Sequence, residues 1–287
     1  MKRKWSNTLK MLSTPRKRCL LVNASMCQAS GRVVPNNIGD DLNCYLLEEM
    51  TGRRVFNKKD VWNVYCLPIY MCIGSILNAR WIHPRGNIVW GAGARNDIDP
   101  PRKRNPKKVV AVRGPKTREL LLKHGVSCPE IYGDPVLLLP RFYRPSIPAC
   151  RYKVGIVPHI YDLENPLLKR LSERYPNDVK IVDVKHYTNW HDVIYSIVSC
   201  EIILSSSLHG LIIADAYNIP NKWVKFSDDT FDGAFKYQDY MLSVGRQDME
   251  PLQMTDIHTL DELYAYSVDY RPIDINLDNL LAACPFL

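Results

Sequence analysis

The sequence SCEIILSSSLHGLIIADAYNIP, residues 199–220, joins a strand pattern to a helix pattern through three serines. Residues 201–204 form a short run rich in apolar, β-branched side chains, which predicts a buried strand. The apolar positions after His209 continue as far as Asn218 and Pro220, which end helices, so a short helix is expected there. Serine hydroxyls and free N–H groups at a helix start can bind an anion such as phosphate or carboxylate. His209 stands beside that site, where an imidazole could transfer a proton.

The same residues also permit a purely structural interpretation. A serine at the start of a helix often serves only as its N-terminal cap. A single histidine in a loop is more often a hydrogen-bonded polar residue than a catalyst, and short motifs carry a risk of false positives. Residue types alone leave the anion site and the structural interpretation open.

The second half of the chain shows strand and helix patterns in regular alternation. Strands are predicted at residues 153–158, 179–184, 201–204 and 223–226, and helices at 166–174, 192–198 and 209–217. Alternation of this kind predicts a parallel sheet with helices on both faces. Residues 257–287 predict terminal helices.

The first half contains similar apolar runs, at residues 19–23, 88–90 and 109–112, and a proline-rich stretch at 140–152 predicts a linker. A chain of 287 residues is long enough for two domains, each with its own core. We therefore expect an α/β protein of two doubly wound, Rossmann-like domains facing a cleft. The first domain would comprise residues 1–148, including a basic N-terminal arm, and the second residues 149–287.

Arg113 lies where a predicted strand ends and a helix opened by Pro115 begins. That is the edge at which doubly wound sheets bind ligands, and a guanidinium can hold a carboxylate or phosphate with two hydrogen bonds. A surface salt bridge is the alternative. Gly91 and Gly93 follow another strand and allow close approach of a ligand to the backbone. Asn96 stands where the dinucleotide fingerprint needs glycine, which argues against a nicotinamide or flavin cofactor.

Charge is distributed unevenly along the chain. Residues 1–150 contain 26 basic and 10 acidic side chains, whereas residues 151–287 contain 12 and 20. A basic half suggests an anionic partner. The basic residues are not interleaved with aromatic ones and no nucleic-acid module is recognisable, which argues against nucleic acid. A pyrophosphate-linked sugar, an anionic membrane surface and a merely solvated surface remain open.

The nine cysteines, an odd number without Cys-x-x-Cys pairs, predict reduced thiols in the cytoplasm and argue against zinc and a disulfide framework. No apolar run is long enough to span a membrane. The basic residues 1–18 lack the apolar core of a signal peptide, and this arm is expected to be poorly ordered unless it docks on something.

Residues 205–220 resemble the signature of the polysaccharide pyruvyl transferase family. Five further segments follow the order of that family: Asn36–Asp40, Gly91–Arg95, Arg113–Gly114, Gly133–Pro135, and Lys236–Tyr240 with Ser243–Gly245. The resemblance implies a fold like that of GT-B glycosyltransferases. It also implies transfer of the enolpyruvyl unit of phosphoenolpyruvate to two hydroxyls of one sugar. The product would be a cyclic pyruvate ketal in capsular, exopolysaccharide or other cell-surface glycan biosynthesis.

The resemblance further implies roles for individual residues. His209 would protonate the methylene carbon of the donor, and Arg113 would hold the donor carboxylate and offset its phosphate charge. The other expected donor-binding residues are Ser206, Ser207, Leu208, Gly210, Arg95 and Lys236, and the expected acceptor-binding residues are Asn37, Asp40 and His159. Some family members have arginine where this chain has Ser207, which is why Arg95 and Lys236 are included. No metal is expected, and no cofactor besides phosphoenolpyruvate as co-substrate.

Two other functions remain open at this stage. A GT-B glycosyltransferase would be protected from heat by a nucleotide sugar and not by phosphoenolpyruvate. A protein without catalytic activity that binds polyanions or the membrane surface would show strong, salt-dependent affinity for polyanions. The sugar acceptor, which a lipid pyrophosphate could carry, and a peripheral location at the inner face of the cell membrane are further expectations.

Overall fold

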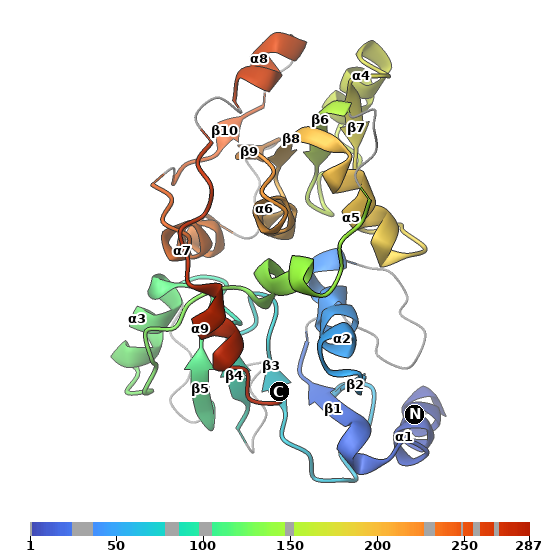
Figure 1. Ribbon diagram of the computed structural model, residues 1–287, viewed down its shortest axis with the longest axis vertical. Coiled ribbons are helices and arrows are strands. Elements are labelled where there is room, and N and C mark those ends of the chain that lie inside the picture. The colour runs from blue at the N-terminus through green and yellow to red at the C-terminus, as the bar shows by residue number, and fades with distance from the viewer. Residues whose placement is uncertain are drawn as a thin grey trace.

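The computed structural model describes residues 2–24, 37–77, 86–97, 105–146, 152–226, 233–247, 249–254, 259–266 and 270–287. Its helices and strands form two α/β units, one above the other in Figure 1. Asn36, which belongs to one of the family-like segments, lies outside the described residues.

The first unit contains the following elements: α1 (Lys2–Leu12), η1 (Arg16–Arg18), β1 (Cys19–Val22), α2 (Ile38–Thr51), β2 (Arg54–Asn57), β3 (Tyr70–Met71), β4 (Ile88–Trp90), β5 (Lys108–Ala111), α3 (Pro115–Lys123) and η3 (Pro135–Arg141). Helix α2 begins where local sequence predicts, because the Asn37 side chain accepts the Gly39 N–H, and it ends at Gly52 in the left-handed region (φ 61°).

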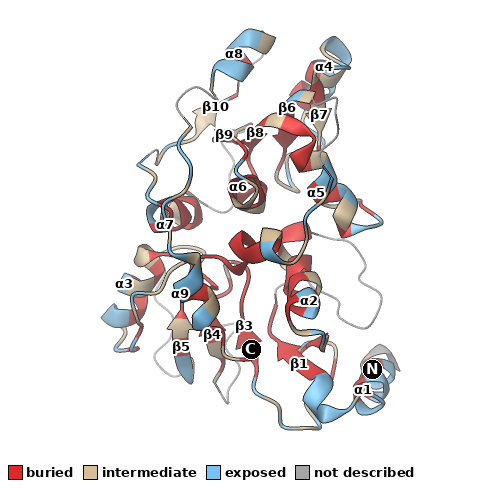
Figure 2. Ribbon diagram, viewed as in Figure 1, coloured by how far each residue is buried: buried red, intermediate tan, exposed pale blue. Residues whose placement is uncertain are grey.

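The second unit contains β6 (Tyr152–Val157), α4 (Pro166–Arg174), β7 (Val179–Ile181), α5 (Trp190–Val198), β8 (Cys200–Ser205), α6 (Leu208–Ala216), β9 (Asn221–Lys225), α7 (Phe235–Ser243), β10 (Leu252–Gln253), α8 (Leu260–Ala265) and α9 (Leu277–Ala282). Strand β8 and helix α6 are buried along nearly their whole length, as Figure 2 shows in red. The fully buried strand explains why its sequence is a continuous apolar run and not an alternating one.

Both sheets have the same topology. The first sheet has the order β2-β1-β3-β4-β5 and the second β10-β9-β8-β6-β7, and the paired strands run parallel. If strands are counted from the start of each unit, both sheets have the order 2-1-3-4-5, which is a doubly wound order. This confirms the expected α/β class with two Rossmann-like units. In such sheets ligands bind beyond the carboxyl ends of the strands where the order reverses, here beside β1 and β3 and beside β6 and β8.

Segments that follow the carboxyl ends of both sheets meet between the two units. The Ile38 N–H at the start of α2 donates to the Val184 carbonyl at 2.9 Å. The Tyr187 hydroxyl donates to the Asp41 carboxylate at 2.5 Å. One hydrophobic core cluster includes residues of both units, so the two sheets share a packed interface.

The last helix returns to the first unit. The Trp90 indole N–H on β4 donates to the Leu280 carbonyl on α9 at 2.8 Å. The Phe286 ring packs edge-on against Tyr70 and Trp90 at 4.9 and 5.5 Å. The division of the chain near residue 148 stays a prediction. Helix α9, which was expected to belong to the second domain, packs on the first sheet (Figure 1). The cause is a long-range apolar contact, which local sequence patterns do not report.

Two expectations about the first unit need correction or extension. The basic arm is helical over α1, which docks on the rest of the first unit. Cys44 is disulfide-bonded, so the prediction that the thiols are all reduced is wrong at this position, whereas Cys19, Cys66, Cys72, Cys128, Cys200 and Cys284 are free. None of the helices in the described part of the chain is long and apolar enough to cross a bilayer.

Candidate active site

The loop between β8 and α6 is fixed by Ser206. Its hydroxyl donates to the Asp162 carboxylate at 2.6 Å and accepts the His159 N–H at 2.8 Å. Its carbonyl accepts the Tyr237 hydroxyl at 2.6 Å. Two residues predicted from different segments, Ser206 and His159, are therefore direct neighbours at the carboxyl edge of the second sheet. The Ser206 hydroxyl already forms hydrogen bonds with protein groups in this structure. Its expected contact with phosphoenolpyruvate therefore stays a prediction.

The start of α6 retains groups that can bind an anion. Ser207 is the N-cap residue, but its hydroxyl makes no capping hydrogen bond. The N–H groups of Leu208, His209 and Gly210 belong to the first helical turn, in which they have no intrahelical partner. A Cβ atom at Gly210 would lie 2.3 Å from the Ser205 hydroxyl, so glycine is required for the helix to approach the strand this closely. These N–H groups and the helix dipole favour a bound phosphate or carboxylate.

The His209 side chain lies between two segments of the first unit. A Cβ atom placed on Gly39 would be 1.9 Å from its Nδ1 atom, so the imidazole packs directly on the backbone at the start of α2. Its Nε2 atom is 3.7 Å from Oδ2 of Asp134. Asp134 is the N-cap residue of η3, where its other oxygen accepts the Val136 N–H at 3.0 Å. A carboxylate of the first unit thus faces an imidazole of the second.

This imidazole and carboxylate are nearly enclosed. The His209 side chain is 11% exposed and that of Asp134 1%. Neither the Nε2 atom of His209 nor the Oδ2 atom of Asp134 has a hydrogen-bond partner among the described residues. Buried polar atoms are nearly always hydrogen-bonded, so two such atoms facing one another mark a place where a further polar group would be accommodated.

Asp40 lies close to the same imidazole. Burial raises the pKa of the Asp40 carboxyl to about 6. The positive charges of His209, Lys59 and Lys236 oppose that rise, and the neighbouring Asp41 adds to it. The carboxyl is also near the backbone after β3, since a Cβ atom at Gly74 would lie 3.3 Å from it. A carboxyl group that titrates near neutral pH beside an imidazole can take part in proton transfer.

Lys236 joins the site from α7. Its side chain is buried, and its Nζ atom lies 5.1 Å from the centre of the Tyr237 ring. The Tyr237 hydroxyl bonds the serine loop, so α7 is tied to the same edge of the second sheet. The charges of His209 and Lys236 both act on the Asp40 carboxyl, so three segments of the sequence contribute to the electrostatics of the site.

Arg113 occupies a different environment from the one expected. It is fully buried, and its guanidinium is paired with Asp239 of α7, with Nε and Nη2 at 3.0 and 2.9 Å from Oδ2. The same guanidinium donates to the Ser75 hydroxyl at 2.6 Å and to the Ala94 carbonyl at 2.7 Å. In this conformation the guanidinium links the first unit to α7. A contact with phosphoenolpyruvate would require Arg113 to separate from Asp239, and that contact stays a prediction.

Asn37 is the N-cap residue of α2, and Arg95 lies in the segment that follows β4. The Asn37 side-chain oxygen accepts the Gly39 N–H at 3.2 Å, so it shapes the turn on which His209 packs. Arg95 is half-buried and follows directly after Ala94, whose carbonyl accepts a hydrogen bond from Arg113. Neither position tests the predicted contact with a ligand.

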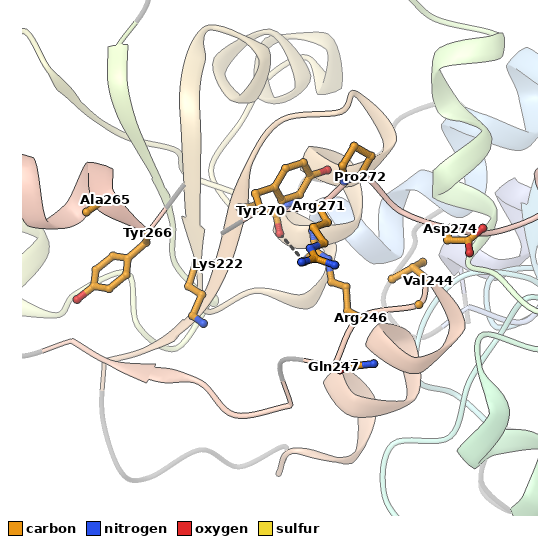
Figure 3. Close-up of a pocket in the computed structure, with 12 residues that line it drawn as sticks. Lys222, Val244, Arg246, Gln247, Ala265, Tyr266, Tyr270, Arg271, Pro272 and Asp274 are labelled. Carbon is orange, nitrogen blue, oxygen red and sulfur yellow. Dashed lines mark hydrogen bonds between the residues drawn. The ribbon is translucent and has the colours of Figure 1, made fainter. Parts of the chain in front are cut away.

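Three cavities lined by described residues lie elsewhere, and none includes His209. One of them, about 500 Å³ in volume, lies beside the amino end of β9 and is shown in Figure 3. Its Arg246 packs against the Tyr270 ring at 5.2 Å and is ion-paired with the buried Asp215. The Asp215 carboxylate also accepts the Tyr240 hydroxyl at 2.6 Å. The arginine charge is thus balanced within the protein.

Sequence reasoning missed four residues that shape the site: Gly39, Lys59, Asp134 and Asp239. Gly39, Asp134 and Asp239 lie within family-like segments, and that position in the sequence could have indicated them. Lys59 lies in a charged run that is typical of an exposed surface, and nothing local distinguishes it. Among the described residues, no cluster of three or more His, Cys, Asp or Glu side chains is placed to hold a metal ion.

Comparison with known proteins agrees with the resemblance seen in the sequence. The family model for polysaccharide pyruvyl transferase matches residues 37–224. The succinoglycan biosynthesis protein ExoV of Rhizobium meliloti is 29% identical over 216 residues, which are 73% of this chain and 62% of that protein. An uncharacterized protein of Acanthamoeba polyphaga mimivirus is 31% identical over 115 residues, 39% of each chain. No solved structure matches.

Proposed function

Because the chain belongs to the polysaccharide pyruvyl transferase family, we propose that it transfers the enolpyruvyl unit of phosphoenolpyruvate to a sugar in polysaccharide biosynthesis. The chain spans 62% and 39% of the lengths of the two relatives it matches, so activity, substrates and partners are part of the proposal. The acceptor is a sugar with two hydroxyls near enough to close one ketal ring.

The observation that carries the proposal is the position of His209. Its imidazole stands at the N-terminus of α6, beside a row of free N–H groups, and faces Asp134 across a gap of 3.7 Å. A phosphate bound at the helix start would place the rest of a small donor near the imidazole. The same edge of the sheet is where doubly wound folds bind their ligands.

The reaction needs an acid, a base and charge compensation. His209 donates a proton to the methylene carbon of phosphoenolpyruvate, and the adjacent carbon becomes cationic and is attacked by the first sugar hydroxyl. Phosphate leaves with its bonding electron pair, and the second hydroxyl closes the ketal. One hydroxyl proton replaces the proton lost by the acid, and the other leaves with phosphate. A positioned acid contributes about 10²- to 10⁴-fold to such a step.

Asp40 is suited to accept a hydroxyl proton from the sugar, because its carboxyl titrates near the pH at which the acid must work. Lys236 and the N–H groups of α6 offset the charge of the donor phosphate. The Asp134 carboxylate faces the imidazole and stabilises its positively charged form. Arg113 acts by holding α7, and with it Lys236, against the first unit.

Mass spectrometry tests the proposal directly. The protein is incubated with phosphoenolpyruvate and a panel of free, nucleotide-linked and lipid-linked sugars, and the products are searched for the mass of an added pyruvate. We expect that mass on one acceptor class, with release of an equal amount of phosphate. Protection from heat by a nucleotide sugar and none by phosphoenolpyruvate would favour a glycosyltransferase instead.

Gly39→Ala should reduce the rate of ketal formation by about 100-fold, because the new Cβ atom must displace the imidazole and misplacement of a reacting group by about 1 Å has an effect of that size. The charge of the site is unchanged by this substitution. The measurement is kcat, with circular dichroism to show that the fold is retained. Full activity in the variant would show that the position of the imidazole on this backbone is unimportant.

Asp40→Asn should abolish the rise of kcat/KM with pH that is expected around pH 6, since the ionised carboxylate is present only above the pKa of about 6. Stability should respond in the opposite direction. When the pKa of a carboxyl is higher in the folded than in the unfolded protein, the free energy of unfolding of the protein falls as pH rises from about 4 to about 6. At pH 7 the asparagine variant should therefore melt no earlier than the wild type. An unchanged pH profile would exclude Asp40 as the base.

A further inference from the structure

Helix α1 presents an apolar face to solvent. Trp5, Leu9 and Leu12 are 55%, 59% and 48% exposed. Their spacing of four and three residues places them on one side of the helix. The opposite side is buried, with Thr8 and Met11 facing the first unit. An amphipathic helix on a protein surface normally turns its apolar residues toward the core. The exposure of these three apolar side chains is therefore not explained by packing within the protein.

The helix is held in this orientation by contacts on its inner side. The Thr8 hydroxyl accepts the Trp62 N–H at 3.0 Å, and the Tyr65 hydroxyl donates to the Leu12 carbonyl at 3.0 Å. At one end of the exposed row, the Trp5 ring also meets the Trp62 ring edge-on at 4.6 Å, although the side chain is 55% exposed. Met11 belongs to a small core cluster of the first unit. The outward direction of Leu9 and Leu12 is therefore fixed by tertiary contacts.

The segment that carries this face is also strongly basic. The first 18 residues contain seven Lys and Arg side chains and no acidic one. Arg16, Lys17 and Arg18 are all exposed, and none of them forms an ion pair with a described residue. A cavity of about 620 Å³ beside η1 is lined by Arg16, Lys17 and Arg53 together with apolar side chains such as Leu67. Cationic and exposed apolar groups are thus combined within the first 18 residues, as in segments that bind anionic lipids.

We propose that α1 and η1 dock the protein on the surface of an anionic lipid bilayer. The exposed apolar row enters the region between headgroups and acyl chains, and the arginine and lysine side chains bind lipid phosphates. Charge complementarity selects this occupant. A second copy of the chain would bring an equally basic face against this one, and three side chains bury far less area than a stable dimer needs. The docking helix lies at the end of the first unit away from the second unit (Figure 1).

Vesicle sedimentation tests this surface independently of catalysis. The full chain is mixed with vesicles of phosphatidylcholine alone and with vesicles containing 30% phosphatidylglycerol at low and at high salt. We expect sedimentation with the anionic vesicles only, weakened at least tenfold by high salt. Leu9→Ser with Leu12→Ser, and separately Arg16→Gln with Lys17→Gln and Arg18→Gln, should each reduce binding at least tenfold.

Leu122→Ser on α3 is the matched control, because this leucine is also exposed, at 43%, but belongs to no exposed apolar row, since Leu120 and Leu121 beside it are buried. Its vesicle binding should equal that of the wild type, and thermal melting should show that all variants are folded. Equal loss in Leu122→Ser, or equal binding to neutral vesicles, would overturn the proposal. So would a change of oligomeric state in Leu9→Ser with Leu12→Ser without a change in vesicle binding, which would indicate a second copy as the partner.

Discussion

His209→Ala is expected to lower kcat for ketal formation by about 10²- to 10⁴-fold while phosphoenolpyruvate still raises the melting temperature of the variant. The rate falls because no other group on α6 can deliver a proton from that position. Donor binding is retained because the N–H groups at the helix start are backbone groups and remain in place. The measurements are single-turnover kinetics and thermal melting with and without the donor.

His186→Ala is the matched control for this substitution. His186 is exposed and bonds Asp183 of its own loop at 3.0 Å, outside the candidate site. Its removal should leave kcat unchanged. If His209→Ala kept full activity, the imidazole would have no part in proton transfer, and the structural interpretation of the serine loop would be the correct one.

Arg113→Ala is expected to destabilise the protein by about 3–5 kcal/mol, because it leaves the buried Asp239 carboxylate without its charged partner. Asp239 also accepts the Thr117 N–H at 2.8 Å and the Thr117 hydroxyl at 2.6 Å, so the carboxylate cannot turn away to solvent without breaking further bonds. Urea unfolding monitored by circular dichroism gives the free energy of unfolding.

Arg118→Ala provides the comparison on the same helix. Arg118 pairs with the largely exposed Glu130 at 3.1 Å, and pairs of this kind contribute about 0–1 kcal/mol. A titration with phosphoenolpyruvate separates the two roles considered for Arg113. Loss of donor affinity with little loss of stability would indicate a direct contact with the donor, and loss of stability with unchanged affinity in the folded fraction would indicate a purely structural role.

Local sequence patterns were sufficient to place the strand and the helix that carry the serine loop. The run at residues 201–204 and the helix signals after His209 are short-range features, because apolar periodicity and helix-ending residues act on their own neighbours. The same features indicated the parallel sheets and the edges on which His209 and Arg113 stand. Most strand boundaries differed by a residue or two, as with β1, which ends at Val22, whereas β7 ends at Ile181, three residues before the predicted end at 184.

The sequence by itself determined the alternation of strands and helices, the doubly wound class and the segments that reach the ligand edge. Only the tertiary structure decided the partners of the charged groups. Arg113 and Asp239 are 126 residues apart, and His209 meets Asp134 and Gly39 of the other unit. It also decided that α9 packs on the first sheet and that α1 turns its leucines outward. Local propensity depends on nearest neighbours, whereas a buried charge or an apolar face is completed by whichever distant segment the packing of the two sheets brings to it.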